Sequence, residues 1–585
     1  MVPRALARLF QLKGTGPFLN TRRNNMDYKQ QVVTALSAVL GADLDAETIS
    51  QLIEQPKSDD LGDYAFPTFA LAKVRRMAPP KIAADIVAAI DQTDFDHVVA
   101  TGAYVNFFLD KVAFAQDTLT AIAEQGEHFG DAQAGSGNVP IDMSSPNIAK
   151  PMSMGHLRST VIGNSLAKIL TKVGYTPIKI NYLGDWGTQF GKLIVAYKKW
   201  GSEADVKADP IKHLLEYYVR FHAEAETQPE LDDEARAWFK KLEDGDAEAT
   251  KLWEWFRGES LKEFKRIYDV LGVDFDSYNG EAFMNDKMDP VIRELQDKHL
   301  LKESQGAEIV DLDAYGMNPA LIRKSDGATL YMTRDLAAAI YRHDHYDFTQ
   351  SLYVVGMEQK EHFAQLKAVL LEMGHEWAND IHHIPFGLIT ANGKKLSTRK
   401  GNVILLDKVL QEAVDLAKAQ IAAKHPDLEN QDEVAQAVGV GAVVFHDLKS
   451  ERKDSFDFNL EEVVRFEGET GPYVQYTNAR AHSILTKAAV QPDATVHLTD
   501  ANAWPVLKQL AAFPDIVLRA ATEYEPSVIA KYALRLAKSF NQYYAHTKVL
   551  VDDEELAGRL ALVQSVTVVL TAALGLLGVK APAAM

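Results

Sequence analysis

Apolar residues along the middle of the chain alternate between short continuous runs and helical spacing. The run at 139–143 is typical of a buried strand, and residues 156–173 place Leu157, Val161 and Leu166 on one helical face. Strands that alternate with helices predict a doubly wound parallel sheet, an α/β fold of the Rossmann type. The alternation returns in predicted strands at 177–183, 352–355 and 381–389 and in a predicted helix at 361–373.

Other patterns flank and interrupt this region. Residues 26–125 combine an amphipathic helix that begins at Met26 with an apolar strand at 104–109, which predicts a small N-terminal α+β domain. The sheet domain spans 126–405, and acidic helical sequence at about 203–300 predicts an inserted subdomain. Residues 406–585 are rich in amphipathic helices and predict an all-α helix bundle.

Residues 1–25 form an extension with five basic residues and no acidic residue. Such a composition is found in mitochondrial transit peptides. Alternatively, Arg22 and Arg23 are encoded by a translated bacterial ribosome-binding site, because two Arg codons can spell AGGAGG. We favour the second interpretation, in which Met26 is the natural start, and the mass of the native protein tests it.

Composition limits the kinds of site that the chain can build. The 585 residues contain no cysteine, which excludes disulfides and Cys-ligated metals, and we find no HExxH or EF-hand pattern, so no metal site is expected. We expect no apolar run to span a membrane, since the closest candidate, 566–579, is short and interrupted by glycine. We therefore expect a cytoplasmic protein. The net charge of −19 argues only weakly against nucleic-acid binding, because a local basic stripe is what matters.

The loop between the strand at 139–143 and the following helix has the chemistry of a phosphate site. The helix begins near Gly155 and His156, and helix N-termini present free N–H groups to anions. Gly155 permits close approach to the backbone, His156 can donate a hydrogen bond, and Lys150 supplies a mobile charge. An ordinary strand-to-helix turn with a surface histidine is the alternative.

A second basic loop, NGKKLSTRKGN at 392–402, follows the last predicted strand. Asn392 and Gly393 predict a tight turn, and four cations follow it. Taken alone, such a run of charge most often marks a solvated surface loop.

The stretch SSPNIAKPMSMGHLRST, Ser144 to Thr160, resembles the ATP-activating loop of the bacterial arginyl-tRNA synthetases, a class I family. The 392–402 loop is similar to the KMSKS loop of that class, with Lys395 to Arg399 in register. Two positions depart from the class pattern: Ser153 replaces the first His of the HIGH element, and Thr398 replaces a lysine. In this family the lysine at the position of Lys150 takes over the missing charge.

The resemblance implies a set of catalytic and ATP-binding residues. The catalytic residues are expected to be Lys150, Ser153, His156 and Lys395. ATP, together with Mg²⁺, is expected to contact Gly155, His156, Gly356, His362, Lys395, Leu396 and Ser397.

The resemblance also implies the amino-acid site. LYMTRDLAAA at 330–339 is similar to the family's substrate element, and Tyr331 and Asp335 within it lie one helical turn apart. A permanently charged, planar guanidinium is well matched by carboxylates and a Tyr hydroxyl. Each residue alone has a structural alternative, such as a surface acid or a core aromatic. The expected arginine contacts are Asp142, Asn147, Trp186, Glu281, Tyr331, Asp335 and Gln359.

Two segments match the family's tRNA-binding regions. GPYVQYTNAR at 471–480 and YALRLAKSFNQYY at 532–544 resemble the anticodon-binding DALR domain, where cations beside aromatic rings suit unpaired bases. An aromatic core stripe of a helix bundle is the alternative. The expected RNA contacts are Tyr476, Arg535 and Lys538, with Tyr104 and Asn106 of the N-terminal domain at the tRNA D-loop.

The resemblance covers nearly the whole chain from Met26. It implies activation of L-arginine by ATP to arginyl-adenylate and transfer to the 3′-terminal adenosine of tRNA(Arg), by a monomer and with tRNA needed for activation. Three alternatives remain: a glutamate or glutamine enzyme of the same class, a small nucleotidylyltransferase, and a non-catalytic tRNA-binding relative. The acidic cluster argues against the glutamate and glutamine enzymes, and the C-terminal bundle argues against a small nucleotidylyltransferase. The retained Lys150, His156 and Lys395 argue against a non-catalytic relative.

Overall fold

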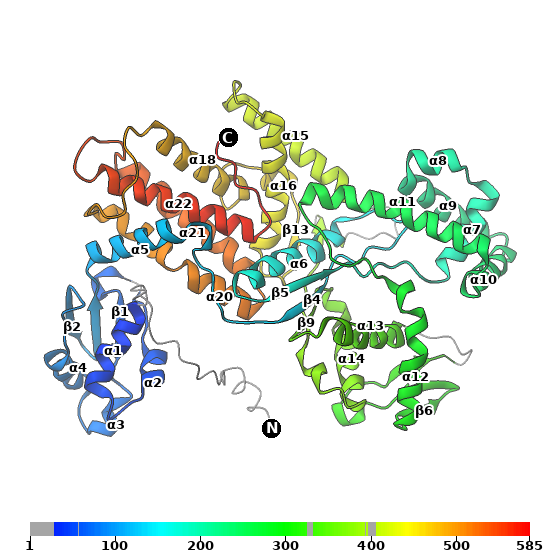
Figure 1. The fold of residues 1–585 in the computed structure, drawn as a ribbon, viewed down its shortest axis with the longest axis horizontal. Coiled ribbons are helices and arrows are strands. Elements are labelled where there is room, and N and C mark those ends of the chain that lie inside the picture. The colour runs from blue at the N-terminus through cyan, green and yellow to red at the C-terminus, as the bar shows by residue number, and fades with distance from the viewer. Residues whose placement is uncertain (1–27, 57, 325–330, 392–393, 396–404) are drawn as a thin grey trace. The chain divides into compact units, whose positions relative to one another are not determined.

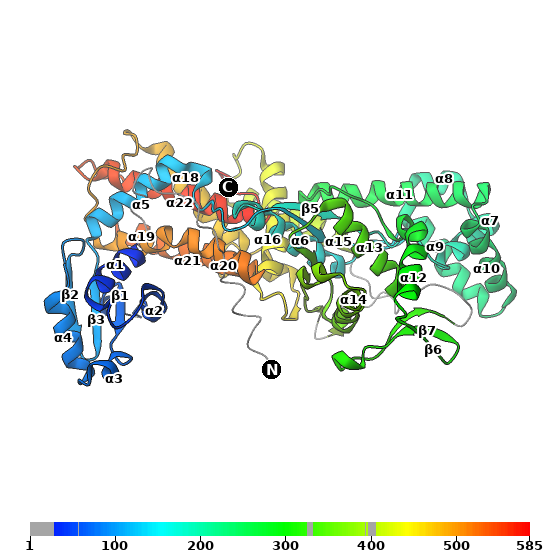
Figure 2. The same cartoon turned by 60° about the horizontal axis from the view of Figure 1, so that its bottom comes forward.

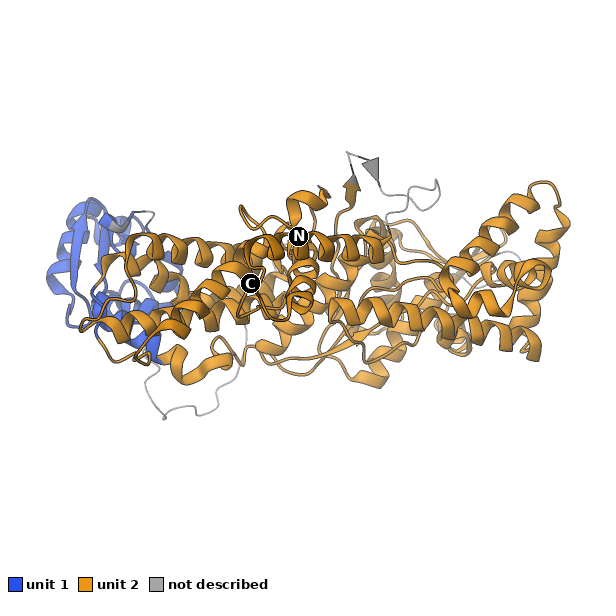
Figure 3. Cartoon of the chain, turned by 90° about the horizontal axis from the view of Figure 1, so that it is seen from above, with its two compact units in different colours: residues 1–120, 497–499 blue, residues 121–496, 500–585 orange. Residues whose placement is uncertain are grey.

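The computed structural model describes residues 28–56, 58–324, 331–391, 394–395 and 405–585. The chain divides into two compact units (Figure 3). Unit 1 comprises the chain up to Thr120 together with His497–Thr499, and unit 2 comprises the remainder. The 1–25 extension and Met26 lie outside the described residues.

Unit 1 contains a three-stranded antiparallel sheet in the order β1-β3-β2. The central strand, β3, confirms the predicted strand at 104–109, and its residues Val105 and Phe107 are fully buried. The predicted helix at Met26 is observed from Tyr28, with Val32, Leu36 and Leu40 on its buried face. The elements are α1 (Tyr28–Leu40), α2 (Ala46–Leu52), β1 (Tyr64–Pro67), α3 (Leu71–Arg75), α4 (Pro79–Ala89), β2 (His97–Thr101) and β3 (Tyr104–Phe108), followed by α5 (Lys111–Gln125).

Unit 2 is built around a four-stranded parallel sheet in the order β10-β9-β4-β5 (Figure 1). This confirms the predicted doubly wound α/β fold. Gly163 lets helix α6 lie directly on strand β4, because a Cβ there would come within 2.4 Å of the Met143 sulfur. The elements are β4 (Asn138–Asp142), α6 (Met154–Lys172), β5 (Thr176–Ile180), α13 (Tyr331–Tyr346), β9 (Ser351–Tyr353), α14 (Lys360–Glu372) and β10 (Ile381–His383).

The strand predicted at 381–389 begins where expected but is too long, because β10 ends at His383. Pro385 has no N–H to donate, and after one further bridge, between Phe386 and Gly356, the chain leaves the sheet. It then forms β11, which pairs in parallel with β13 and antiparallel with β12. The short strand β13 also corrects the expectation that the chain is entirely helical from about 405. These strands are β11 (Ile389–Ala391), β12 (Lys394–Lys395) and β13 (Phe456–Asp457).

The segment predicted as one helical insertion, 203–300, contributes to two different groups. Helices α9, α10 and α11 pack with α7, and α8 packs with α9 (Figures 1 and 2). Helix α12 instead packs on α13 within the core that Leu336 and Tyr353 share. A three-stranded antiparallel sheet, β6-β7-β8, follows α12 and has no counterpart among the predicted elements. The elements are α7 (Gln189–Trp200), α8 (Glu203–Ala208), α9 (Pro210–Ala225), α10 (Glu230–Glu243), α11 (Ala247–Leu271), α12 (Met288–Asp297), β6 (Leu301–Ser304), β7 (Ala307–Val310) and β8 (Ala320–Arg323).

The C-terminal region is a helix bundle, as predicted. Helix α22 is 21 residues long and apolar enough to cross a membrane, which corrects the expectation that no run reaches that length. Most of its residues are buried against α18, α21 and other helices, as in the core helix of a bundle. The helices are α15 (Leu406–Lys424), α16 (Gln431–Lys449), α17 (Leu460–Val463), α18 (Gly471–Lys487), α19 (Trp504–Ala511), α20 (Phe513–Glu523), α21 (Ser527–His546) and α22 (Leu556–Leu576).

Candidate active site

The loop between β4 and α6 has a strained backbone that its neighbours hold in place. Ser144, Ser145 and Ala149 have φ angles of 72°, 48° and 60°, a region that residues with side chains rarely adopt. The Ser144 N–H donates to the Ser159 Oγ at 2.8 Å. Strained residues of this kind persist where the surroundings over-determine them, and they cluster at functional sites.

His156 and Ser153 form a reciprocal pair at the start of α6. The Ser153 N–H donates to His156 Nδ1 at 3.0 Å. With Nδ1 used as an acceptor, the proton of a neutral imidazole resides on Nε2, which is then a donor for a phosphate oxygen. Burial lowers the pKa of His156, and nearby Lys150 lowers it further, so the ring is neutral at pH 7.

The chain from Leu183 to Trp186 connects this loop to the predicted arginine residues. Asn147 forms a parallel bridge with Gly184, and the Glu281 N–H donates to the Leu183 carbonyl at 2.9 Å. The Trp186 backbone N–H in turn hydrogen-bonds the Glu281 carboxyl. The structure therefore brings Asn147, Trp186 and Glu281 together.

Glu281, the first residue of a 3₁₀ helix (Glu281–Lys287), is a buried carboxyl with acidic neighbours. Burial raises its pKa to about 7; Arg334 opposes this shift, whereas Asp335 and Asp185 add to it. A nearby cation stabilises the ionised form of such a carboxyl. A bound guanidinium would supply that positive charge.

Asp335 and His362, predicted for arginine and for ATP respectively, contact each other. The two atoms Nε2 of His362 and Oδ2 of Asp335 lie 2.6 Å apart, and both side chains are about a quarter exposed or less. This leaves the Oδ1 atom of Asp335 without a partner in the hydrogen bonds of the described residues. The pair therefore places His362 beside a residue predicted to bind arginine.

Asp142, a predicted arginine contact, already binds an internal guanidinium. Arg342 donates to its Oδ2 at 2.7 Å, and both side chains are about 5% exposed or less. Burial alone would lower the pKa of Arg342, but the Asp142 carboxylate raises it. The Arg342 guanidinium also lies 5.2 Å and 5.0 Å from the ring centres of Tyr182 and Tyr353.

Sequence reasoning missed Arg342, and a signal for it exists. Arg342 follows Asp335 by seven residues on α13, so both project from the same face of that helix. In this structure Asp142 binds Arg342 through Oδ2 and accepts the Ser145 hydroxyl at Oδ1.

The remaining predicted arginine contacts are less enclosed. The side chain of Tyr331 is 66% exposed at the start of α13, although it shares that helix with Asp335 as predicted. Gln359 is exposed at the end of a 3₁₀ turn (Met357–Gln359), which begins after the buried Gly356. The rings of Trp253 and Phe239 flank Trp186, with ring centres 5.8 Å and 5.7 Å away.

The basic loop that resembles KMSKS lies mostly outside the described residues. Leu396, Ser397, Thr398 and Arg399 belong to that part, and of Lys395 the structure gives the backbone alone, in β12. Strand β11, which precedes the loop, is held by β13.

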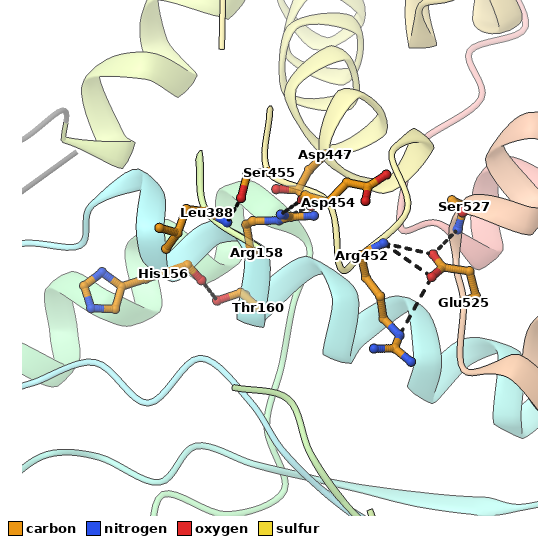
Figure 4. Close-up of polar contacts among 10 residues, drawn as sticks. All are labelled: His156, Arg158, Thr160, Leu388, Asp447, Arg452, Asp454, Ser455, Glu525 and Ser527. Carbon is orange, nitrogen blue, oxygen red and sulfur yellow. Dashed lines mark hydrogen bonds and ion pairs between the residues drawn. The ribbon is translucent and has the colours of Figure 1, made fainter. Parts of the chain in front are cut away.

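The segment 452–457, which includes β13, is tied to both α6 and the C-terminal helices (Figure 4). Arg158 of α6 donates to Asp447 of α16 at 3.3 Å and to the Asp454 carbonyl at 2.8 Å, and both Arg158 and Asp447 are 1% exposed. Burial raises the pKa of Asp447 to about 6, against the effect of Arg158. Ser455, which follows Asp454, accepts a hydrogen bond from the N–H of Leu388, just before β11.

Arg452 provides the link to the bundle. Its side chain donates to the Pro385 carbonyl at 2.8 Å and to the Tyr524 carbonyl at 3.0 Å, and its backbone N–H donates to Glu525 (Figure 4). Glu525 also accepts the N–H of Ser527, the first residue of α21. The strand that leads into the basic loop is thus connected to the helix on which Arg535 and Lys538 are found.

A cavity of about 860 Å³ in the bundle combines aromatic and basic side chains. The Arg480 guanidinium lies 5.0 Å from the ring centre of Tyr476 and 5.5 Å from that of Tyr544. Lys487 and Lys548 also line this cavity. Sequence reasoning named Tyr476 but missed Arg480, although the two are four residues apart on α18 and therefore neighbours on one helical face.

The other predicted RNA contacts lie elsewhere. Arg535 lines a separate cavity of about 370 Å³ with Arg519 and Lys531, and Lys538 is exposed on α21. In unit 1, the side chain of Asn106 is 2% exposed because it lies in the central strand, whereas Tyr104 is half-buried. Among the described residues, no three His, Asp or Glu side chains gather as metal ligands would.

Known proteins match all three regions of the chain. Residues 118–460 match the family of tRNA synthetases class I (R), catalytic domain. Residues 474–585 match the DALR anticodon binding domain, and residues 26–109 match the arginyl tRNA synthetase N terminal domain.

Whole proteins match at similar coverage. The chain is 68% identical to arginine–tRNA ligase of Latilactobacillus sakei over 563 residues, which are 96% of this chain and 100% of that protein. It is 69% identical to arginine–tRNA ligase of Lactiplantibacillus plantarum, with 95% and 100% covered. The solved structure of Thermus thermophilus arginyl-tRNA synthetase has a TM-score of 0.78 at 26% identity, with 95% and 100% covered.

Proposed function

The chain belongs to the family of class I arginyl-tRNA synthetases, and we propose that it is an arginine–tRNA ligase that works at the site described above. In the first step the carboxylate of L-arginine attacks the α-phosphate of ATP, which gives arginyl-adenylate and pyrophosphate. In the second step the 2′-hydroxyl of the terminal tRNA adenosine attacks the activated carbonyl and releases AMP. The buried carboxyl of Glu281 next to Asp335, connected to the ATP loop through Asn147, is the observation that supports this most.

For the ATP half of the site, we propose that the phosphates bind at the N-terminus of α6. His156 donates from Nε2, Gly155 permits close approach of the nucleotide, and Lys150 neutralises developing charge. Ser153 contributes by fixing the His156 ring. Lys395, Leu396, Ser397 and Gly356 complete the proposed ATP contacts, and ATP enters as its Mg²⁺ complex.

For the arginine half, we propose that Glu281 and Asp335 share the substrate guanidinium. The half-ionised Glu281 gains a cation, and the Oδ1 atom of Asp335 accepts a hydrogen bond. Lysine or citrulline would leave buried acceptors unpaired, and polar sites reject analogues in that way. Tyr331, Gln359, Trp186 and Asn147 complete the proposed pocket.

For tRNA(Arg), we propose that the cavity around Arg480 binds unpaired anticodon bases. Two tyrosine rings and three cations suit stacking on bases and neutralisation of phosphates. Arg535 and Lys538, which lie on α21 outside this cavity, are proposed as further RNA contacts, and Tyr104 contacts the tRNA from the N-terminal domain. Function as a monomer in the cytoplasm completes the proposal.

Aminoacylation tests this function directly. The purified chain, ATP–Mg²⁺ and tRNA(Arg) should charge radiolabelled arginine and should discriminate against lysine and citrulline. Asp335→Asn should raise the KM for arginine by at least about tenfold, since a charge-assisted hydrogen bond is lost. Equal charging of lysine, or an unchanged KM in the variant, would contradict the proposed roles.

A further inference from the structure

Lys150 contacts a ring that no part of the proposed function uses. Its Nζ lies 5.3 Å from the ring centre of Tyr218, on helix α9 of the inserted helices. An ammonium group at this distance from an aromatic face is attracted by the quadrupole of the ring. The contact therefore connects the inserted helices to the ATP loop at its charged residue.

Helix α11 holds the same loop at two further points. Ser260 Oγ accepts the Ala149 N–H at 3.0 Å, and the Tyr268 hydroxyl lies 2.7 Å from Ser144 Oγ. Ser260 and Tyr268 are 0% and 1% exposed, so both contacts are buried. Both contacts fix residues with positive φ, Ser144 and Ala149, which need neighbours to hold them.

Tyr218 is not needed to fill the core of the inserted helices. Its neighbour Tyr217 is 8% exposed and does so, whereas Tyr218 is partly exposed. The Tyr218 and His222 rings form a T-shaped pair with ring centres 4.7 Å apart, and the Lys150 ammonium lies over the Tyr218 ring. Among the described residues no hydrogen bond to the Tyr218 hydroxyl is formed, so the ring is the part that acts.

We propose that Tyr218 is a positioning residue for Lys150 and that α9 and α11 together clamp the ATP loop for the activation step. Tyr218 holds the ammonium at the loop before ATP arrives, so that less side-chain freedom is lost when the phosphates bind. Ser260 and Tyr268 fix the backbone that carries Lys150. This inference rests on the proposed role of Lys150.

The test measures ATP–pyrophosphate exchange with arginine and tRNA(Arg) for wild type, Tyr218→Leu, Tyr218→Phe, Lys150→Ala and the double variant Lys150→Ala/Tyr218→Leu. Tyr218→Leu should lower kcat about three- to tenfold, and Tyr218→Phe should retain wild-type turnover, because the ring face persists. In the Lys150→Ala background, Tyr218→Leu should have no further effect. Trp200→Leu is the matched control, since it removes a ring from a different cation–π pair. There the Arg220 guanidinium of α9 lies 4.5 Å from the centre of the Trp200 ring.

Each other outcome has one meaning. If Lys150→Ala leaves exchange unchanged, the proposed role of Lys150 fails. If Lys150→Ala is impaired but Tyr218→Leu has no effect, raises turnover, or has the same effect with and without Lys150, the clamp is wrong. Should Tyr218→Leu unfold, a trifluorophenylalanine at this position keeps the shape of the ring and weakens its quadrupole; kcat should fall relative to phenylalanine, and equal rates would overturn the proposal.

Discussion

At the scale of single residues, the proposed arginine site contains three acids whose charges are balanced to different degrees. Asp142 is paired with the internal Arg342, Asp335 is supported by His362, and Glu281 is buried with a raised pKa. A substrate guanidinium therefore gains most from the last two. Selectivity for a cation follows from burial as much as from the number of acids.

The first prediction concerns the pH dependence of arginine binding. The pKa of Glu281 is about 7 in the folded protein, above its ordinary value of 4.5, so the carboxyl binds its proton below pH 7. Bound arginine favours the ionised form, so binding releases a proton and tightens as pH rises towards 7 and slightly above. Calorimetry should give a Kd about tenfold weaker at pH 6 than at pH 8.

The same shift affects stability in the opposite sense. Because the folded-state pKa is raised, the stability that Glu281 contributes is fully present below about pH 4.5 and is lost as pH rises through 7.

Because Glu281 is the group expected to titrate on arginine binding, Glu281→Gln should remove the pH dependence of that binding and should also weaken the binding. A variant that keeps the wild-type pH profile would show that another group titrates.

The second prediction separates two roles for His362. Because its Nε2 is 2.6 Å from Asp335, His362→Ala should raise the KM for arginine about tenfold and the KM for ATP less than about twofold. His362→Asn should restore part of the loss, since an amide can still donate. Steady-state exchange kinetics measure both constants, with His345→Ala at the exposed end of α13 as a control. If the KM for ATP rises more than the KM for arginine, His362 contacts the nucleotide instead.

At the scale of elements, the segment 452–457 joins α6, β11 and α21. Arg158 and Arg452 donate six hydrogen bonds here, three of them to backbone carbonyls. The helix that begins the ATP site and the strand that leads to the basic loop are therefore fixed by one short segment. Disturbing the buried Arg158–Asp447 ion pair, which lies beside this segment, should therefore affect both elements.

The third prediction tests that ion pair. Asp447→Ala leaves the Arg158 guanidinium buried without its carboxylate and should lower the free energy of unfolding by about 3–5 kcal/mol. Asp432→Ala on the same helix, α16, removes an acid that is 84% exposed beside Lys418 and should change it by less than about 1 kcal/mol. Denaturant unfolding followed by circular dichroism compares the two. Equal losses would mean that burial of the pair is not important.

The fourth prediction concerns RNA binding by α18. Arg480→Ala removes the cation between Tyr476 and Tyr544 and should raise the KM for tRNA about tenfold, with the KM for arginine unchanged. Arg236→Ala, on α10 and 66% exposed, controls for loss of one surface charge. If both variants bind tRNA equally well in a filter assay, the Arg480 cavity is not the RNA site.

At the scale of the whole molecule, the sequence predicts what depends on local order. The β4–α6 unit, the helix at 361–373 and the C-terminal bundle are observed because hydrophobic periodicity and helix N-terminal signals are local. The pairs Asp142–Arg342 and Arg158–Asp447 join residues 200 and 289 positions apart, which no local pattern encodes. The split of the 381–389 strand has a local cause, Pro385, which the strand prediction did not weigh.

The central claim is that this site activates arginine, and ATP–pyrophosphate exchange tests it most directly. Exchange should require L-arginine, should be strongest with tRNA(Arg) present, and should fall at least about a hundredfold in Lys150→Ala, because a cation that stabilises the transition state is lost. Lysine or glutamate in place of arginine should give no signal. Absence of arginine-dependent exchange both with and without tRNA(Arg), from folded protein, would contradict the account.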